Sequence, residues 1–341
     1  MSFRVSIQPG GQQFEAAEDT TILQAALDAG YLLPYGCRDG ACGACKGRIL
    51  EGSVDYGKAS PNTLTEAEKD AGLALFCCAT PRTDLLLECK QITHSSDIPV
   101  KKLPCRVQRL EKVASDVMIL EVKLPASEKF QFRAGQYIDF LLPGNRRRSF
   151  SIANSPHGAD HLELHIRHID GGAFTGQVFN QMKEKDILRF EGPLGSFFLR
   201  EESVKPVVLL AGGTGFAPIK SIVEHVLQAG IERPMVLYWG ARNRDGLYLD
   251  ALAKSWEKML AGFKYVPVLS DMPAGEGWQG RTGLVHQAVM GDLPDLSGHQ
   301  VYACGAPAMI DAARADFVSK CGLPEEEFFA DAFTYAAEAN T

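Results

Sequence analysis

The stretch numbered 34–45 reads PYGCRDGACGAC. It places three cysteines at the spacing C-x4-C-x2-C, namely Cys37, Cys42 and Cys45. A [2Fe–2S] cluster requires four thiolates that converge on two irons, and this spacing is typical of the first three. Glycines between them let a loop wrap tightly and bring backbone N–H groups close to sulfur, namely Gly36, Gly40 and Gly43. The stretch therefore predicts a cluster-binding loop in the N-terminal part of the chain.

The fourth thiolate is expected downstream, where residues 75–81 read LFCCATP and offer Cys77 and Cys78. A zinc site is a poorer interpretation, because structural zinc usually takes paired C-x2-C units. A disulfide framework is disfavoured, because the chain is long and its nine cysteines are an odd number. The cysteine pattern thus indicates iron–sulfur chemistry.

Residues 1–92 resemble a plant-type ferredoxin, a family in which the last ligand follows a short apolar run and precedes a proline by four positions. The resemblance assigns Cys77 as the fourth ligand and leaves Cys78 as an adjacent packed thiol. The sequence patterns predict a strand hairpin, a capped helix, the cluster loop, a strand, a short helix and a closing strand. This order resembles the β-grasp ferredoxin fold.

The whole chain has 341 residues and a net charge of −7, and it is long enough for two or three domains. No basic block is present, which argues against nucleic-acid binding. No apolar run approaches the ~20 residues that cross a membrane. The first residues, MSFRVSIQPG, lack the apolar core of a signal peptide, so a cytoplasmic location is expected. We expect a ferredoxin domain at 1–92, a polar linker at 93–102, a second domain at 103–200 and a third at 201–341.

Short alternating apolar runs, punctuated by Gly and Pro, fill residues 103–200 and predict an antiparallel β-barrel. The stretch at 147–151, RRSFS, combines a cation, an aromatic ring and hydroxyls. Such a set suits a phosphate-bearing flat ring system, because the cation pairs with phosphate and the ring lies against the heterocycle. The candidate residues are Arg148, Ser149, Phe150 and Ser151. A basic strand end without a ligand is the alternative.

A second candidate phosphate site in the barrel joins Arg167 to the glycine-rich stretch that contains Gly172 and Thr175. Its backbone N–H groups could hold a pyrophosphate if Thr175 opens a helix, and an ordinary helix cap is the alternative. Nearby histidines lack a carboxylate or cysteine that would complete a metal site, so none is predicted at His157, His161, His165 and His168.

From residue 205 the pattern changes to alternating strands and helices, which predicts a parallel sheet with helices on both faces. The first of these strands leads into AGGTGFAP at 211–218 and then into an amphipathic helix. This turn is not the Rossmann G-x-G-x-x-G, but it can place phosphate or nicotinamide at a helix N-terminus. The candidate residues of the turn are Gly213, Thr214, Gly215 and Pro218. A second motif, CGAPAM, begins at Cys304 and Gly305, and a plain buried strand-end cysteine is its alternative.

Together these motifs resemble the ferredoxin–NADP⁺ reductase superfamily, whose signatures are R-x-Y-S, G-G-T-G-x-[AT]-P and C-G-x-x-x-M. The resemblance implies FAD, although FMN occurs in some members. It implies that Arg148 meets the flavin phosphates, that Phe150 lies against the isoalloxazine and that Ser151 sits near its reactive nitrogen. Because Phe150 replaces the usual tyrosine, the stacking role is kept and the phenol hydrogen bond is lost.

The same resemblance implies that Gly172 and Thr175 lie at the pyrophosphate and that Cys304 lies near the nicotinamide C4. The last aromatic residue of the stretch FFADAF, Phe333, is expected to shield the flavin face. Ser151 and Cys304 are therefore the candidate catalytic residues. The expected fold is multidomain, combining an α+β ferredoxin domain, a flavin-binding β-barrel and an α/β nucleotide-binding domain.

The choice between NADH and NADPH depends on the stretch that follows residue 241. Arg242 and Arg244 could hold the 2′-phosphate of NADPH, whereas Asp245 would repel it. Bacterial relatives with an N-terminal ferredoxin mostly use NADH, so the resemblance favours NADH.

The three expected cofactors form a path for electrons. NADH gives two electrons as hydride, a flavin accepts both and releases them singly, and a [2Fe–2S] cluster carries one at a time. The resemblance points to CDP-6-deoxy-3,4-glucoseen reductase or to the reductase component of a bacterial mono- or dioxygenase. The expected partner is a dehydrase or oxygenase component that accepts electrons. A non-enzymatic redox carrier or sensor is the alternative, but a carrier needs no hydride donor.

Overall fold

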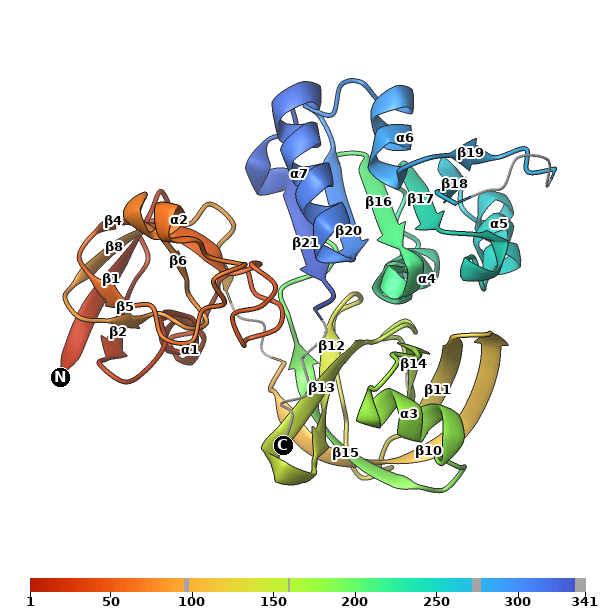
Figure 1. Cartoon of the computed structure of the whole chain (residues 1–341), viewed down its shortest axis with the longest axis horizontal. Helices are drawn as coiled ribbons and strands as arrows, with labels where there is room; N and C mark the ends of the chain where they lie inside the picture. The colour runs from red at the N-terminus through yellow and green to blue at the C-terminus, as the bar shows by residue number, and fades with distance from the viewer. Residues whose placement is uncertain (95–97, 159, 272–276, 335–341) are drawn as a thin grey trace. The chain divides into compact units, whose positions relative to one another are not determined.

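The chain divides into two compact units, each described by itself. The first consists of Met1–Pro99 with Gly195–Phe197, and the second of Val100–Leu194 with Phe198–Thr341. The three sequence-based domain boundaries stay predictions. The computed structural model (Figure 1) describes residues 1–94, 98–158, 160–271 and 277–334.

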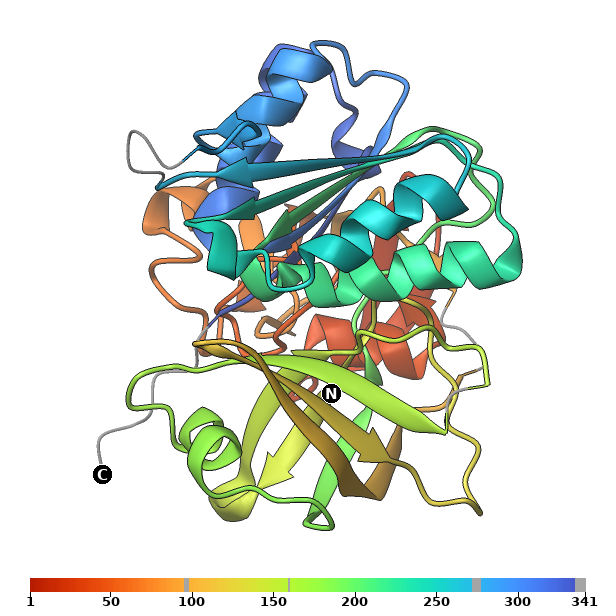
Figure 2. The same ribbon diagram turned by 90° about the vertical axis from the view of Figure 1, so that its right-hand side faces the viewer.

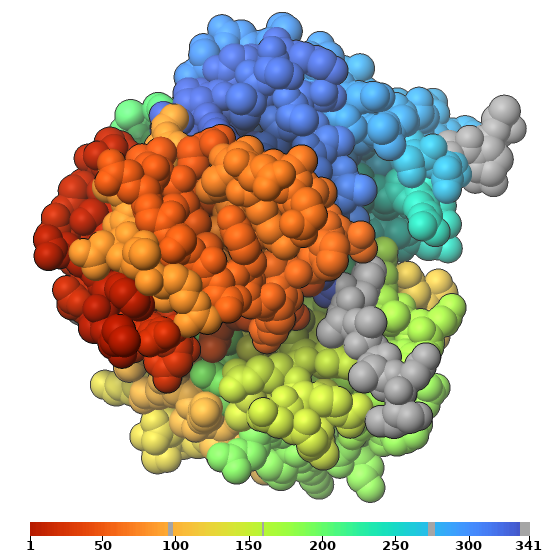
Figure 3. Space-filling model, turned by 60° about the vertical axis from the view of Figure 1, so that its left-hand side comes forward, coloured from red at the N-terminus to blue at the C-terminus, as the bar shows by residue number. Residues whose placement is uncertain are grey.

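The first unit is built on a mixed five-stranded sheet of order β2-β1-β8-β4-β6, in which β1 and β8 run parallel. Figure 3 shows this unit, coloured red to orange, as one continuous body. With a helix against the sheet, this arrangement is the β-grasp fold that the sequence predicts. The sheet strands are β1 (Ser2–Gln8), β2 (Gln13–Ala17), β4 (Lys46–Glu51), β6 (Leu73–Leu75) and β8 (Leu85–Glu88). Two small ladders pair β3 (Tyr31–Leu32) with β9 (Thr93–His94) and β5 (Val54–Asp55) with β7 (Thr80–Pro81).

Two capped helices flank the cluster loop in sequence. Helix α1 (Ile22–Asp28) begins after Thr21, whose hydroxyl accepts the Gln24 N–H at 3.3 Å. Helix α2 (Glu66–Asp70) begins with a capping box, in which Thr65 and Glu68 exchange hydrogen bonds. The first free N–H groups of α1 donate to the carbonyls of residues 76 and 79, which fixes the segment that carries Cys77 and Cys78.

The expected linker contains regular structure at both ends. Thr93 and His94 form β9, and β10 begins at Lys101. Residues 95–97 lie outside the described residues.

The second unit contains a six-stranded antiparallel sheet of order β13-β12-β15-β10-β11-β14. A bridge between Ile152 and Leu164 joins its two outer edges and closes the sheet into a barrel, as the sequence predicts. Helix α3 (Ala173–Asn180) packs Phe174 and Val178 into the barrel core. The strands are β10 (Lys101–Ala114), β11 (Val117–Lys123), β12 (Tyr137–Leu142), β13 (Arg146–Ser151), β14 (His161–Arg167) and β15 (Ile187–Leu194), with a short turn η1 (Pro143–Asn145).

The same unit contains a six-stranded parallel sheet of order β19-β18-β17-β16-β20-β21. Helices α4 and α5 cover one face and α6 and α7 cover the other (Figure 2), which confirms the predicted α/β architecture. The strands are β16 (Val207–Gly212), β17 (Met235–Ala241), β18 (Phe263–Leu269), β19 (Arg281–Thr282), β20 (Gln300–Gly305) and β21 (Phe328–Ala332). The helices are α4 (Phe216–Ala229), α5 (Asp250–Met259), α6 (Val285–Asp292) and α7 (Pro307–Cys321), with short turns η2 (Gly213–Gly215), η3 (Arg244–Gly246) and η4 (Glu325–Glu327).

The strand order of this sheet reverses between β16 and β20. Ligands of open α/β sheets bind outside the carboxyl ends of the strands at such a switch point. The glycine turn η2 follows β16, and Cys304 and Gly305 end β20, so both predicted nucleotide motifs lie at this point. No helix among the described residues is long and apolar enough to cross a membrane.

Candidate functional site

The four predicted cluster ligands lie in two pairs. The backbone N–H groups of Cys37 and Cys42 each donate to the sulfur of the other at 3.3 Å. The N–H of Cys77 donates to Cys45 Sγ at 3.5 Å. Cys45 and Cys77 are buried, whereas Cys37 and Cys42 are only half-buried. Two pairs of thiols fit a two-iron cluster, which takes two ligands on each iron.

The thiols of this loop influence one another. The side-chain hydrogen bond between the Cys77 and Cys45 thiols is the largest cause that raises the pKa of Cys77 to about 12. Burial and the charges of the Cys45 and Cys37 sulfurs also raise it, against a smaller opposing effect of Cys78. Among the described residues, no three or more His, Cys, Asp or Glu side chains are grouped to hold a single metal ion. Bound iron would supply the positive charge that ionises these thiols.

Cys78 lies behind the cluster loop. Its sulfur is 3.6 Å from Cys77 Sγ, and a Cβ atom added to Gly40 would lie 2.7 Å from it. Gly40 has a φ of +82°, a conformation that favours glycine, and its lack of a side chain lets the loop backbone pass close to the Cys78 thiol. This contact supports the interpretation of Cys78 as a packed thiol.

Strand β13 presents its predicted flavin-binding residues on two faces, because side chains alternate along a strand. Arg148 and Phe150 project on one side, and the Phe150 ring lies 5.5 Å from Phe174 at the edge of the core. On the other side, Ser149 donates to Asp139 at 2.6 Å. The neighbouring cation Arg147 is held by ion pairs with Glu191 and Asp139. Arg148 and Phe150 are therefore the pair best placed for one ligand.

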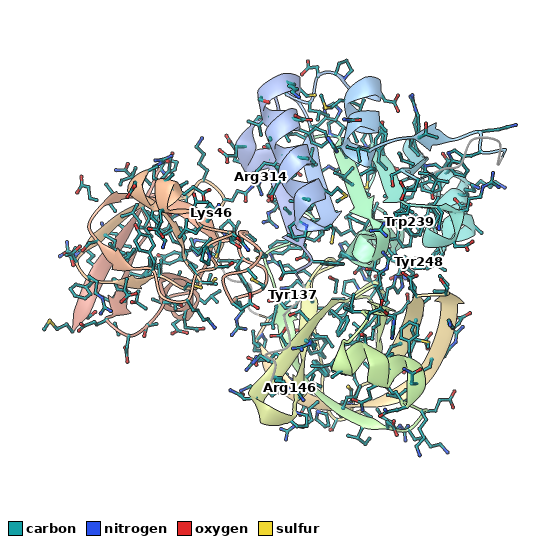
Figure 4. The ribbon with its side chains drawn as sticks, viewed as in Figure 1. Lys46, Tyr137, Arg146, Trp239, Tyr248 and Arg314 are labelled. Carbon is teal, nitrogen blue, oxygen red and sulfur yellow. The ribbon has the colours of Figure 1, made fainter. Side chains whose placement is uncertain are left out.

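Replacing Arg148 with alanine is expected to weaken FAD retention. The change removes a charge-assisted phosphate contact worth roughly 1.5–3 kcal/mol, or about 10- to 100-fold in the dissociation constant. FAD occupancy after dialysis is the measurement. Arg146→Ala is the matched control, because Arg146 is exposed on the same strand and bonds only the Pro143 carbonyl among the described contacts (labelled in Figure 4). Equal FAD loss from both variants would contradict the role of Arg148.

The turn before α3 differs in detail from the expectation. The helix begins at Ala173 after Gly172, so Thr175 is its third residue and does not open it. The Thr175 hydroxyl is within 3.3 Å of the Ile169 and Gly172 carbonyls and accepts the Ile169 N–H, so it braces the turn from inside. A role of Gly172 and Thr175 at a pyrophosphate stays a prediction. Because the Thr175 hydroxyl is engaged within the turn, backbone N–H groups would have to bind the phosphate.

The structure brings Ser151 and Cys304 to a single carboxylate. Ser151 Oγ donates to Asp331 Oδ2 at 3.3 Å, and Cys304 Sγ lies 3.9 Å from the same oxygen. All three residues are buried. Burial and the nearby Asp331 carboxylate raise the pKa of Cys304 well above its ordinary value, so the thiol stays protonated. The two predicted catalytic residues thus meet where the barrel adjoins the parallel sheet.

No motif in the sequence predicts Asp331 as part of the site. Its only signal was a lone acidic residue inside the apolar stretch FFADAF. Burial raises the pKa of Asp331 to about 6, against smaller opposing effects of the Ser151 and Cys304 hydrogen bonds. A buried carboxyl with a perturbed pKa beside two predicted catalytic residues is a candidate site residue.

Asp331→Asn is expected to stabilise the protein increasingly as the pH rises from 4 to 7. Below its ordinary pKa of 3.8 the carboxyl is protonated in both states and costs nothing. Between pH 3.8 and about 6 the unfolded chain ionises while the folded carboxyl keeps its proton, so the cost grows with pH, and it levels off above the folded-state pKa of about 6. The difference between these two pKa values corresponds to a loss of folding stability of about 3 kcal/mol, which is complete above pH 7. Thermal unfolding of both proteins between pH 4 and 7 measures the effect, and a difference that does not change with pH would contradict it.

The glycine turn approaches the end of β20 closely. A Cβ atom on Gly215 would lie 2.1 Å from the Cys304 carbonyl oxygen, and one on Gly212 would lie 2.6 Å from Met309 Sδ. Thr214 is the middle residue of η2, and Pro218 lies in the first turn of α4. The Phe333 N–H donates to the Gly305 carbonyl at 2.8 Å, which brings Phe333 to the same strand end.

Comparison with known proteins identifies three families along the chain. Residues 5–82 match the 2Fe-2S iron-sulfur cluster binding domain, 104–199 the oxidoreductase FAD-binding domain and 209–315 the oxidoreductase NAD-binding domain. These matches agree with the predicted order of cofactors.

Full-length relatives carry the same order. The chain is 44% identical, over 98% of its length and 99% of the relative, to the CDP-6-deoxy-L-threo-D-glycero-4-hexulose-3-dehydrase reductase of Yersinia pseudotuberculosis. It is 37% identical, over 99% of its length and 96% of the relative, to DmpP, the phenol 2-monooxygenase reductase component of a Pseudomonas species. The crystal structure of the Amycolatopsis cytochrome P450 reductase GcoB matches with a TM-score of 0.78 and 33% identity over 98% of this chain and 99% of that one. The chain therefore belongs to the iron–sulfur flavoprotein reductases of the ferredoxin–NADP⁺ reductase superfamily, which combine a [2Fe–2S] domain with FAD- and NAD-binding domains.

Proposed function

We propose that this reductase takes electrons from NADH through FAD and the [2Fe–2S] cluster to a dehydrase that acts on a CDP-linked deoxysugar. The observation that carries the proposal is the 44% identity to the Yersinia dehydrase reductase over 98% of the chain. The second candidate acceptor is an oxygenase component, favoured by the 37% identity to the phenol 2-monooxygenase reductase component. We also propose a cytoplasmic location.

The residues of the second unit fit the two nucleotides. Arg148 would pair with flavin phosphates, Phe150 would lie against the ring system, and the η2 turn would hold NADH at the N-terminus of α4. When bound, FAD accepts hydride from NADH and returns electrons one at a time. Ser151 and Cys304 would line the contact between the two rings, and Asp331 holds both side chains in place.

The cysteines of the first unit fit both the binding of the cluster and the transfer of electrons to a partner protein. Cys45 and Cys77 are buried, and Cys37 and Cys42 are half-buried. Cys37 and Cys42 would therefore hold the more exposed side of the cluster, which is the side that a partner protein could approach to accept electrons.

An anaerobic NADH titration of the purified protein tests the electron path. We expect the flavin absorbance to bleach and a rhombic EPR signal of the reduced cluster to follow. Flavin reduction without the EPR signal would overturn the path to the cluster. Initial rates of reductase turnover at varied NADH and NADPH concentrations test the nucleotide preference. We expect NADH to have the higher kcat/KM, because the exposed Asp245 would repel a 2′-phosphate.

The partner is tested separately, with the dehydrase that the Yersinia reductase serves and with the phenol 2-monooxygenase oxygenase component. We expect only the dehydrase, supplied with its substrate, to accelerate NADH consumption. Acceleration by the oxygenase component alone would replace the first candidate with the second.

A further inference from the structure

Strand β14 has two chemically different faces. Leu162, Leu164 and Ile166 point into the barrel core. The alternate residues are polar, and they point away from the core toward the nucleotide-binding part of the same unit: Glu163, His165 and Arg167. Polar side chains on an inner face require partners. Glu163 and His165 find theirs on α4 and on the segment after β17, whereas Arg167 pairs with Asp116 of the barrel at 3.2 Å.

Glu163 and His165 belong to a hydrogen-bonded chain in which the His165 side chain is fully buried and the Glu163 side chain largely so. His165 Nε2 lies 2.8 Å from Glu163 Oε1, and His165 Nδ1 lies 2.8 Å from the Tyr248 hydroxyl. Lys220 Nζ, on α4, lies 3.1 Å from Glu163 and 2.8 Å from Glu224. The chain thus joins the barrel to α4 and to the segment that follows β17.

One set of protonation states satisfies the whole chain. Burial lowers the pKa of His165 and raises that of Tyr248, so both are neutral. Burial opposes ionisation of Glu163, but His165 and Lys220 outweigh it and hold its pKa at about 2. Tyr248 therefore donates to His165 Nδ1, and His165 Nε2–H donates to the Glu163 carboxylate.

The chain reaches the glycine turn through aromatic rings. The Tyr248 ring meets Trp239 edge-on, with centroids 5.3 Å apart, and both lie on the barrel side of the parallel sheet (Figure 4). Trp239 Nε1 donates to the Gly213 carbonyl at 3.0 Å. From the barrel, the Arg167 guanidinium packs on the same glycine, since a Cβ atom there would lie 2.9 Å from Nη1. Gly213 is therefore contacted both by Trp239 of the parallel sheet and by Arg167 of the barrel.

We propose that Tyr248, His165 and Glu163 are positioning residues that set the height of the Gly213–Gly215 turn above the flavin barrel, and so the approach of the nicotinamide to the flavin. None of them need touch the reacting atoms. The inference rests on the proposed NADH-to-FAD transfer. Hydride transfer is sensitive to such placement, because a misplacement of about 1 Å can cost on the order of 100-fold in rate.

Tyr248→Phe is the test, because it removes one hydroxyl and keeps the ring against Trp239. Stopped-flow flavin reduction over a range of NADH concentrations gives the limiting rate and the NADH dissociation constant. We expect the limiting rate to fall on the order of 10-fold, with the dissociation constant within about twofold of the wild type and a larger primary isotope effect from deuterated NADH. Glu163→Gln, which weakens the ion pair with Lys220, is expected to change the rate in the same direction.

His157→Gln is the matched control. His157 Nε2 lies 2.9 Å from His225 Nδ1, so this pair also joins the barrel to α4, but more than two helical turns away from Gly215. We expect wild-type limiting rates. Wild-type rates in both Tyr248→Phe and Glu163→Gln, or equal losses in the control, would overturn the inference alone. Loss of rate that only follows loss of bound FAD would also overturn it, whereas wild-type protein that NADH does not reduce would overturn the proposed function itself.

Discussion

Cys77→Ser is expected to leave the protein without its [2Fe–2S] cluster. The residue lies in the buried pair with Cys45, on a segment that the N-terminus of α1 holds in place. A serine hydroxyl is a poor iron ligand compared with a thiolate, and the hydrogen bonds from α1 to the carbonyls of residues 76 and 79 oppose a shift of the segment. The measured iron content should fall from about two irons per chain toward zero, and the visible absorption spectrum should keep only the flavin bands.

Cys78→Ser is the matched control for this prediction. Its sulfur touches Gly40 behind the loop, so serine should be accommodated with the cluster retained. NADH should still bleach the flavin in both variants, since the flavin site is in the other unit. The opposite iron contents, with the cluster lost from Cys78→Ser and kept in Cys77→Ser, would show that Cys78 is the fourth ligand.

Gly215→Ala is expected to slow flavin reduction by NADH on the order of 100-fold while FAD remains bound. The added methyl group would lie 2.1 Å from the Cys304 carbonyl oxygen and 3.0 Å from the Gly305 nitrogen. Backbone atoms of a central strand cannot move aside like the end of a side chain, so the turn must shift away from β20 at a cost of about 1–3 kcal/mol. A shift of this size is expected to lower the rate on the order of 100-fold. Stopped-flow mixing with NADH measures it, and reduction by dithionite confirms that the flavin is present.

Gly291→Ala provides the comparison within the same sheet domain. Gly291 is in α6, and no atom lies within 4 Å of the position that its Cβ would take. Alanine is the better helix former, so the variant should keep wild-type rates and gain about 0.5–1 kcal/mol of stability. Wild-type reduction rates in Gly215→Ala would show that the turn does not set the nucleotide site.

The order of elements could be predicted because each element carries a local signal. The alternation of Leu162, Leu164 and Ile166 predicts β14, and the Thr65–Glu68 pair predicts the start of α2. The apolar stripe after Pro218 predicts α4. Such signals lie within a few residues of one another, and the structure confirms the β-grasp, barrel and parallel-sheet architectures that they indicate.

The site was predicted less completely because its contacts join distant parts of the sequence. Asp331 is 180 residues from Ser151 and 27 from Cys304, so no local pattern connects them. His165 appeared in the sequence as one of several nearby histidines, whereas its partner Tyr248 lies 83 residues away. Thr175 was expected to open α3, but Gly172 precedes the helix and leaves the threonine hydroxyl inside the turn.

The strand order of the barrel also determines when each strand can pair during synthesis of the chain. Strand β10 pairs with β11, which follows it immediately in the chain, but its other edge pairs with β15. Lys101 therefore cannot pair with Gly192 until the ribosome has synthesised β15. At typical translation speeds the second partner emerges roughly 5–20 s after the first part of β10. During that interval a long strand presents an open edge to other nascent chains. Yield of soluble protein should therefore respond more strongly to slow translation or to chaperone supply than the stability of the finished barrel would suggest.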